Sequence, residues 1–302
     1  MEYRIAQKDD WNSIITLVNE AFKSSAPMEK AFPLLFNKSN NTSYVALDKG
    51  EIVSFIGGVP YSLKGKDHSY PCISLGAVCT RADYRGRGIL DNLLKLALRE
   101  YEEAGFTFAL ISGGRGLYLR NGFVPFGAFN QYILTKSPSK SDSCKYDIYE
   151  STGRIRELLE LHSLYERKEV KLSASINEFK LLLEGRAIAR IMKMEQKIFI
   201  AREAGRAVSY VIVGIRERDG IKEGLVIDFS GAEKGIYEIL KRAYCQEGLD
   251  KLTVVIKSDN SRLNELFREE TYTLIENQGT FLSFSEGPDK AIIPYTSNLN
   301  YV

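Results

Sequence analysis

Arginine and glycine alternate over Arg85–Gly88, between an apolar segment that ends at Thr80 and an amphipathic one that begins at Leu90. Glycine lacks a Cβ atom, so the backbone of this segment can approach a ligand closely. A helix that starts directly afterwards offers unpaired N–H groups and a partial positive charge, which together bind phosphate oxygens. The stretch Ile73–Leu90 therefore predicts a phosphate or pyrophosphate site, and the alternative is a turn without a ligand.

Two other phosphate-binding motifs do not fit this stretch. The chain has no G-x-x-x-x-G-K-[ST] sequence of the P-loop type. The dinucleotide pattern G-x-G-x-x-G also fails, because Asp91 stands where the third glycine belongs.

Strands and helices must hold this segment in place. Apolar Ile73–Thr80 predicts a central strand, and the apolar stripe of Leu90–Ala104 predicts a helix that ends at Gly105. The other elements expected in the first half are a strand at Tyr3–Ala6 and a helix after Asp10, a hairpin of Ser43–Leu47 and Ile52–Tyr61, a strand at Phe106–Ile111, a short helix at Gly116–Asn121 and a strand at Phe126–Leu134 that closes the sheet.

The second half repeats this order of elements: hairpin, strand, helix, strand, helix, strand, ending with Thr280–Phe284. A polar stretch with one proline, KSPSKSDSCK, separates the halves and predicts a linker or surface loop. We therefore expect a duplicated mixed α/β fold, with domains at 1–136 and 146–302 joined by residues 137–145.

Composition limits the classes of partner. The net charge is only +2, which gives no electrostatic reason to expect nucleic acid or an anionic membrane. No apolar run approaches the roughly 20 residues that span a membrane, and the N-terminus has no apolar signal segment, so we expect a cytoplasmic protein. The 4 cysteines form no C-x-x-C pair and only 2 histidines exist, so we expect no metal site.

In its strand-to-helix setting, Tyr84–Ile89 resembles the pyrophosphate loop of the Gcn5-related N-acetyltransferases, which reads Arg/Gln-x-x-Gly-x-Gly/Ala. Arg85 and Gly88 match its first and fourth positions, whereas Leu90 stands where a small residue is usual. That departure resembles the tandem-domain branch of enhanced-intracellular-survival proteins. Those relatives carry an additional sterol-carrier-like domain at the C-terminus, before which this chain stops.

A second segment, Leu117–Phe123, is similar to the Tyr-x-x-x-Gly-Phe sequence of the same family, with Tyr118 four residues before Gly122. The resemblance implies that Tyr118 stands near the coenzyme sulfur and acts as general acid toward the departing thiolate. A phenol with the usual pKa of about 10 can donate a proton or a hydrogen bond there. The alternative is a core aromatic whose hydroxyl is satisfied by another group.

The resemblance implies acetyl-CoA as the acyl donor, bound at the loop and along the strand before it, where free backbone groups contact the pantetheine arm. The implied cofactor-binding residues are Val78, Cys79, Thr80, Arg85, Gly86, Arg87, Gly88, Ile89, Leu90, Gly113 and Gly114.

The second half has Ser230–Gly235 where a second loop belongs, without an Arg-x-x-Gly pattern and with Glu233 to oppose a phosphate. We therefore expect the second half to be a degenerate copy of the first domain that forms part of the acceptor pocket wall or a homo-oligomer contact. No glutamate lies on Ile73–Thr80 to serve as base. In the tandem-domain branch the terminal carboxylate serves, which makes Val302 the candidate here, with the loop residue His68 as a weaker one.

Two functions follow from these features. The first is an N-acetyltransferase that acts on a primary amine of a small molecule, peptide or protein, which Tyr118 favours. The second is a CoA or acyl-CoA sensor or scaffold without catalysis, which the lack of an evident base favours. A transferase that uses aminoacyl-tRNA has little support, because the charge balance gives no tRNA footprint.

Overall fold

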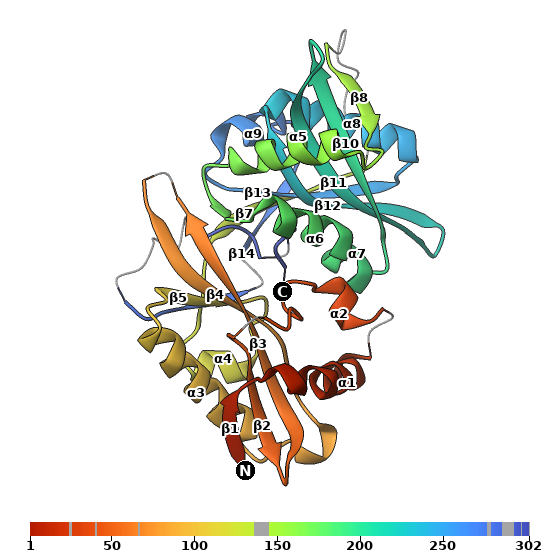
Figure 1. Ribbon diagram of the computed structural model, residues 1–302. Helices are drawn as coiled ribbons and strands as arrows, with labels where there is room; N and C mark the ends of the chain where they lie inside the picture. The colour runs from red at the N-terminus through yellow and green to blue at the C-terminus, as the bar shows by residue number, and fades with distance from the viewer. Residues whose placement is uncertain are drawn as a thin grey trace.

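The computed structural model describes residues 1–23, 26–39, 41–65, 67–135, 145–276, 279–285, 293–296 and 298–301. Two mixed sheets, each flanked by helices, form two lobes (Figure 1). The predicted fold class, mixed α/β with two similar sheets, is confirmed. Of the expected linker 137–145, only Lys145 lies within the described residues, so the domain limits 1–136 and 146–302 remain a proposal.

The first sheet has the strand order β1-β2-β3-β4-β5-β15-β6, and the short β9 pairs with β3. Its strands are β1 (Glu2–Ile5), β2 (Tyr44–Asp48), β3 (Glu51–Lys64), β4 (Ser69–Thr80), β5 (Phe108–Ile111), β6 (Val124–Pro125), β9 (Lys171–Leu172) and β15 (Thr280–Ser283). Its helices are the 3-10 turns η1 (Lys8–Asp10) and η2 (Ala82–Tyr84), and α1 (Trp11–Phe22), α2 (Met28–Ala31), α3 (Ile89–Glu103) and α4 (Gly116–Arg120).

Helices cover both faces of this sheet (Figure 1). One core forms between the sheet and α1 with α2, and the other between the sheet and α3 with α4. Helix α3 buries the stripe that its sequence predicts, including Leu94, Ala97 and Tyr101. It ends before Gly105, whose φ of +84° is the left-handed conformation that favours glycine after a helix.

The second sheet has the order β14-β7-β13-β12-β11-β10-β8. Its strands are β7 (Ala128–Leu134), β8 (Asp147–Glu150), β10 (Glu195–Glu203), β11 (Arg206–Arg218), β12 (Ile221–Gly231), β13 (Lys251–Lys257) and β14 (Tyr272–Glu276). Its helices are α5 (Ile155–Glu166), α6 (Ile176–Gly185), α7 (Ala187–Ile191), α8 (Glu233–Glu247) and α9 (Ser261–Leu266).

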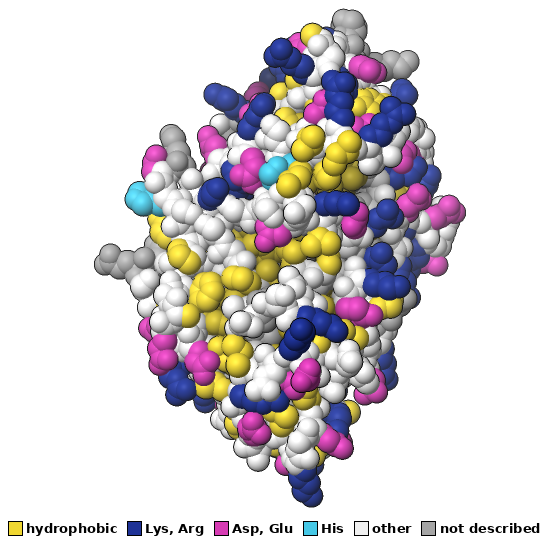
Figure 2. Space-filling view, in the orientation of Figure 1, with side chains coloured by type: hydrophobic (Ala, Val, Ile, Leu, Met, Phe, Trp, Pro, Cys, Tyr) yellow, Lys and Arg dark blue, Asp and Glu magenta, His cyan; other side chains and the backbone are white. Residues whose placement is uncertain are grey.

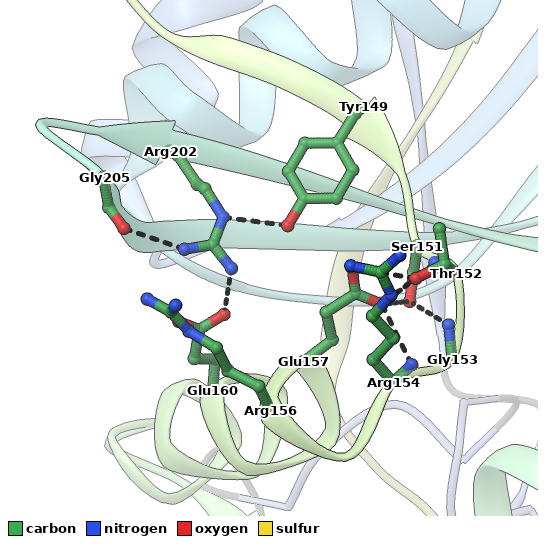
Figure 3. Close-up of polar contacts among 10 residues, drawn as sticks. All are labelled: Tyr149, Ser151, Thr152, Gly153, Arg154, Arg156, Glu157, Glu160, Arg202 and Gly205. Atoms are coloured by element: carbon green, nitrogen blue, oxygen red, sulfur yellow. Dashed lines mark hydrogen bonds and ion pairs between the residues drawn. The ribbon is translucent and has the colours of Figure 1, made fainter.

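Helix α5 is fixed to the second sheet by polar contacts at two points (Figure 3). At its start, the buried Glu157 accepts a 2.8 Å hydrogen bond from the Ser151 hydroxyl. In its middle, Glu160 pairs with Arg202 of β10, which also donates a 2.8 Å hydrogen bond to the Tyr149 hydroxyl. These contacts attach one face of the helix to β8 and β10.

One strand of each half lies in the sheet of the other half. β7, from the first half, pairs with β13 and β14, whereas β15, from the second half, pairs with β5 and β6. The expectation that Phe126–Leu134 closes the first sheet is therefore wrong. Both strands offer the same backbone groups to the same kind of sheet edge, so their sequence alone does not select the partner.

Candidate functional site

The parallel strands β4 and β5 separate at the centre of the first sheet. They pair only from Cys72 opposite Phe108 to Leu75 opposite Ile111. Beyond this point β4 continues to Thr80 beside β3 alone. The separation leaves backbone groups on one side of β4 without a strand partner and opens a gap at the carboxyl ends of both strands, where open α/β sheets bind ligands.

A bulge in β4 adds to this separation. The register with β3 shifts so that Ile56 stands opposite two residues, Ala77 and Val78. Ala77 has a φ of +51°, a left-handed conformation that is uncommon for residues other than glycine. Bulges of this kind redirect the strand and occur beside active sites.

The turn after β4 leads directly into α3. Gly86 and Gly88 have φ angles of +75° and +72°, and Gly88 is the N-cap residue of α3. A Cβ atom at either position would meet no atom within 4 Å, so the backbone angle, not crowding, requires glycine there. The open space in front of the helix N-terminus is the geometry that a phosphate group needs.

Two arginines of this turn are held by neutral partners. The Arg85 Nε donates a 3.2 Å hydrogen bond to the Thr80 carbonyl. Arg87 donates a 2.8 Å hydrogen bond to the Asp83 carbonyl, and its guanidinium lies 4.8 Å from the centre of the Tyr84 ring. Neither arginine forms an ion pair with any acidic residue that the structure describes, so both charges are available to an anion.

The predicted cofactor-binding segments line one cavity of about 740 Å³. Val78–Thr80 form one wall and Arg85–Leu90 another. Two carbonyls on β4 already accept bonds, since the Ser54 hydroxyl donates to Cys79 (2.9 Å) and Arg85 to Thr80. A carbonyl oxygen has two lone pairs, so these bonds still leave acceptor capacity.

A second cavity, of about 380 Å³, adjoins the first, and both are lined by Phe22, Val78 and Arg115. Of the two further predicted residues, Gly113 lines the second cavity and Gly114 lines neither. The structure thus brings the predicted residues to one place, apart from Gly114.

Tyr118 of α4 lies in the wall of the second cavity and is only 3% exposed. No residue that the structure describes forms a hydrogen bond with its hydroxyl, which argues against the satisfied core aromatic. Burial raises the pKa of Tyr118 to about 12, Arg115 acts in the opposite direction and Cys79 adds slightly to the rise. The phenol therefore stays protonated at neutral pH and can donate a hydrogen bond to a ligand in the second cavity.

Several lining residues of the second cavity were missed by sequence reasoning: Lys23 at the end of α1, Met28 and Phe32 around α2, Ile191 and Lys193 at the end of α7, and Tyr301. They come from three distant parts of the chain, and no local motif marks them. Val302 lies outside the described residues, directly after Tyr301. His68 stacks near Tyr70 with ring centres 6.1 Å apart and lines neither cavity.

In the second sheet the parallel strands β12 and β13 also separate, but no turn comparable to Arg85–Gly88 precedes the helix. β12 and β13 stop pairing after Leu225 opposite Thr253, yet only Ala232 connects β12 to α8. A Cβ at Gly231 would lie 2.1 Å from the Val208 carbonyl oxygen, and one at Gly235 would lie 2.4 Å from the Ser209 hydroxyl. This helix N-terminus packs against β11, in contrast to the open one of α3.

Two absences concern the described part of the chain only. It holds no group of three or more His, Cys, Asp or Glu side chains that would suit a metal ion. It also has no helix with the length and apolar character needed to cross a bilayer.

Residues 2–126 match the family model of the acetyltransferase (GNAT) domain. The chain is similar in structure to a GCN5-related N-acetyltransferase from Anabaena variabilis, with 13% identity, a TM-score of 0.75, and coverage of 94% of this chain and 73% of that one. It is also similar to Eis1 from Mycobacterium abscessus (13% identity, TM-score 0.69, 94% and 74% coverage). No curated protein matches the sequence.

A further similar structure is N-myristoyltransferase from Saccharomyces cerevisiae with bound myristoyl-CoA (11% identity, TM-score 0.55, 93% and 82% coverage). At these identities the solved structures show the fold alone. The family model supports the resemblance of residues 2–126 to the GCN5-related N-acetyltransferases, and the solved structures show that the two-lobed fold of the chain also occurs in Eis1.

Proposed function

We propose that this chain, which carries an acetyltransferase (GNAT) domain over residues 2–126, transfers an acetyl group from acetyl-CoA to a primary amine of a small molecule, peptide or protein. One observation carries the proposal: two adjoining cavities in the gap between β4 and β5. One of them contains the open helix N-terminus, and the other contains the unpartnered Tyr118 hydroxyl.

The donor half of the proposal rests on the first cavity. The N–H groups of α3, Arg85 and Arg87 suit the pyrophosphate of a CoA thioester. Val78–Thr80 offer backbone groups to the amides of a pantetheine arm, because β4 has no strand partner on that side. The sulfur then lies near the junction of the two cavities, where Val78 and Arg115 each contribute to both walls.

In the reaction, the neutral amine attacks the thioester carbonyl, so that a C–N bond forms, the C–S bond breaks and the sulfur leaves with the electron pair. Tyr118 acts as the acid toward this sulfur. With a pKa of about 12 it is a weaker acid than a thiol, so we expect it to stabilise the thiolate chiefly by donating a hydrogen bond. A base takes up the proton released by the amine, and its transfer to the thiolate completes the thiol.

The base that takes this proton is proposed to be the terminal carboxylate of Val302. The support is that Tyr301, the residue before it, lines the second cavity. A chain with one added C-terminal residue should then keep its affinity for acetyl-CoA and lose turnover. Unchanged turnover in that chain would exclude this carboxylate.

A sensor or scaffold that binds acyl-CoA without catalysis is the second candidate. The observation in its favour is that no carboxylate side chain occurs among the described residues that line the second cavity.

The test is a calorimetric titration with acetyl-CoA, followed by a screen of amines for thiol release. Arg85→Glu places a negative charge at the proposed phosphate site and should abolish binding. The matched control is Arg262→Glu on α9, which reverses a charge at an exposed arginine that lines neither cavity. Failure of the wild-type chain to bind any acyl-CoA would refute the proposal, whereas binding without thiol release would favour the sensor.

A further inference from the structure

The wall of the second cavity combines apolar side chains with positively charged ones. Apolar side chains such as Phe32, Leu75 and Ile191 form much of its wall, and its charged residues are Lys23, Arg115 and Lys193. None of the lining residues that the structure describes is acidic. Figure 2 shows apolar side chains gathered where the two lobes meet, with lysine and arginine side chains beside them.

Within the described residues, the positive charges of the second cavity have no acidic partner. No acidic side chain in the described ranges forms an ion pair with Lys23, Arg115 or Lys193. Arg115 lines both cavities and is within reach of either ligand, but Lys23 and Lys193 line only the second one. The two lysines are therefore not part of the wall proposed for the pyrophosphate.

The backbone of both lysines is unusual. Lys23 has a φ of +46° and Lys193 a φ of +53°, and each follows a helix, α1 or α7, at a position that glycine commonly occupies. A cation near a helix C-terminus is favourable, which gives each lysine a structural role as well. That role alone does not explain why two such lysines, one from each lobe, line the same cavity.

We propose that the acceptor is an amine that also bears an anionic group, a carboxylate or a phosphate, on an apolar body. This proposal rests on the proposed function, because it concerns the amine that the second cavity would receive. Lys23 and Lys193 would bind the anionic group from opposite lobes, and the apolar wall would hold the body. Polycationic amines should be poor acceptors, because three like charges face them.

The same charges favour the reactive form of the amine. Among the described residues, the titratable or charged groups that line the cavity are Lys23, Arg115, Tyr118, Lys193 and Tyr301, and no acidic side chain is among them. The proposed Val302 carboxylate would be the single negative group beside these three cations. Nearby cations disfavour an ammonium ion, so the pKa of a bound amine should fall and more of it should be neutral.

Matched pairs of acceptors test the proposal. Phenylalanine and 2-phenylethylamine differ by a carboxylate, and O-phosphoethanolamine and ethanolamine differ by a phosphate, so the pairs also distinguish the two anions. We expect the anionic member of at least one pair to have a kcat/KM higher by roughly tenfold to a hundredfold, the range of one or two charge-assisted hydrogen bonds. Equal values within both pairs, or preference for the uncharged members, would overturn the proposal.

Glycine substitutions separate binding from backbone structure. Lys23→Gly and Lys193→Gly remove a charge from positions whose φ suits glycine. Each should raise the KM for the anionic acceptor by about tenfold and leave the Kd for acetyl-CoA unchanged. Lys49→Gly is the matched control, because Lys49 has a φ of +50° and lines neither cavity. Unchanged KM in both variants would show that the lysines only end their helices.

A binding measurement keeps this inference separate from catalysis. N-acetylphenylalanine should bind more tightly than N-acetyl-2-phenylethylamine and should lose that advantage in Lys193→Gly, whether or not the chain turns over. If acetyl-CoA binds and amines are acylated without this difference, the anionic acceptor is refuted and the transferase stands. If acetyl-CoA does not bind, the proposed function fails first.

Discussion

At the scale of single residues, the environment of Tyr118 determines whether its hydroxyl can act as a hydrogen-bond donor. Its hydroxyl has no hydrogen-bond partner among the described residues although the side chain is almost fully buried. Most buried hydroxyls have a partner within the protein, whereas Tyr118 lines the second cavity, so its free hydroxyl is open to a ligand there. The same burial that raises its pKa keeps the phenol protonated and able to donate.

Tyr118→Phe should therefore lower kcat by about 10²–10³-fold, the usual contribution of one positioned hydrogen-bond donor, without changing the Kd for acetyl-CoA. The folded-state pKa of about 12 lies above the ordinary value, so the donor form persists throughout the range from pH 6 to about pH 10. We expect no loss of kcat from this group as the pH rises to about 10. Stopped assays of thiol release across that range measure both effects.

Tyr44→Phe is a suitable control, since the Tyr44 hydroxyl donates a 2.9 Å hydrogen bond to Glu100 and Tyr44 lines neither cavity. It removes a phenol hydroxyl in the same lobe without changing either cavity. A descending limb in the wild-type profile below pH 10 that disappears in Tyr118→Phe would contradict the raised pKa.

At the scale of elements, the turn between β4 and α3 distinguishes the two halves. Both halves contain a strand, a helix and a parallel strand that separate beyond their first pairs. In the first half, the loop Arg81–Gly88 stands between β4 and α3, whereas only Ala232 stands between β12 and α8. This contrast supports one anion site in the chain and not two.

Gly88→Ala tests this element. A Cβ at Gly88 touches nothing, so the expected cost comes from the left-handed backbone angle, about 1–2 kcal/mol of stability. If the turn holds the pyrophosphate, its altered angle should also weaken acetyl-CoA binding. Denaturant unfolding and calorimetry give the two quantities.

Gly220→Ala provides the comparison, because Gly220 has a φ of +77° in the turn between β11 and β12 and equally open surroundings. It should lose similar stability and keep acetyl-CoA binding. Loss of affinity in both variants to the same extent would mean that general destabilisation, not the turn, weakens the site.

At the scale of the whole molecule, the exchanged strands make the halves interdependent. β15 covers the edge of β5, and the ring centres of Phe281 on β15 and Phe108 on β5 lie 5.3 Å apart. β7 likewise lies between β13 and β14 in the second sheet. A cut in the polar stretch between the halves therefore leaves each fragment with an unpaired strand and an open sheet edge, which promote aggregation.

The fragment 1–136 should accordingly fail to fold as a soluble monomer, although the family model matches most of it. Coexpression with the fragment 137–302 should restore a soluble complex that binds acetyl-CoA. Circular dichroism, size-exclusion chromatography and calorimetry provide the readouts. A folded, acetyl-CoA-binding fragment 1–136 would show that β15 is dispensable for the site.

The sequence by itself determined the parts of the site that are local. The alternation of Arg85–Gly88 and the spacing of Tyr118 from Gly122 lie within single turns, where residue type fixes backbone angle and charge. The stripe of Leu90–Ala104 and the strand Ile73–Thr80 were likewise readable, because periodicity reports burial within one element. The mixed α/β fold with two similar sheets followed from the order of such elements.

Only the tertiary structure decided which distant segments meet. Lys23, Lys193 and Tyr301 carry no motif, and they share a cavity because α1, α7 and the last described residues converge on the gap beside β4. The sequence likewise did not predict that β7 and β15 are exchanged between the two sheets. Backbone hydrogen bonds are the same for every strand, so the choice of sheet edge depends on the packing of the whole chain and not on the strand's own residues.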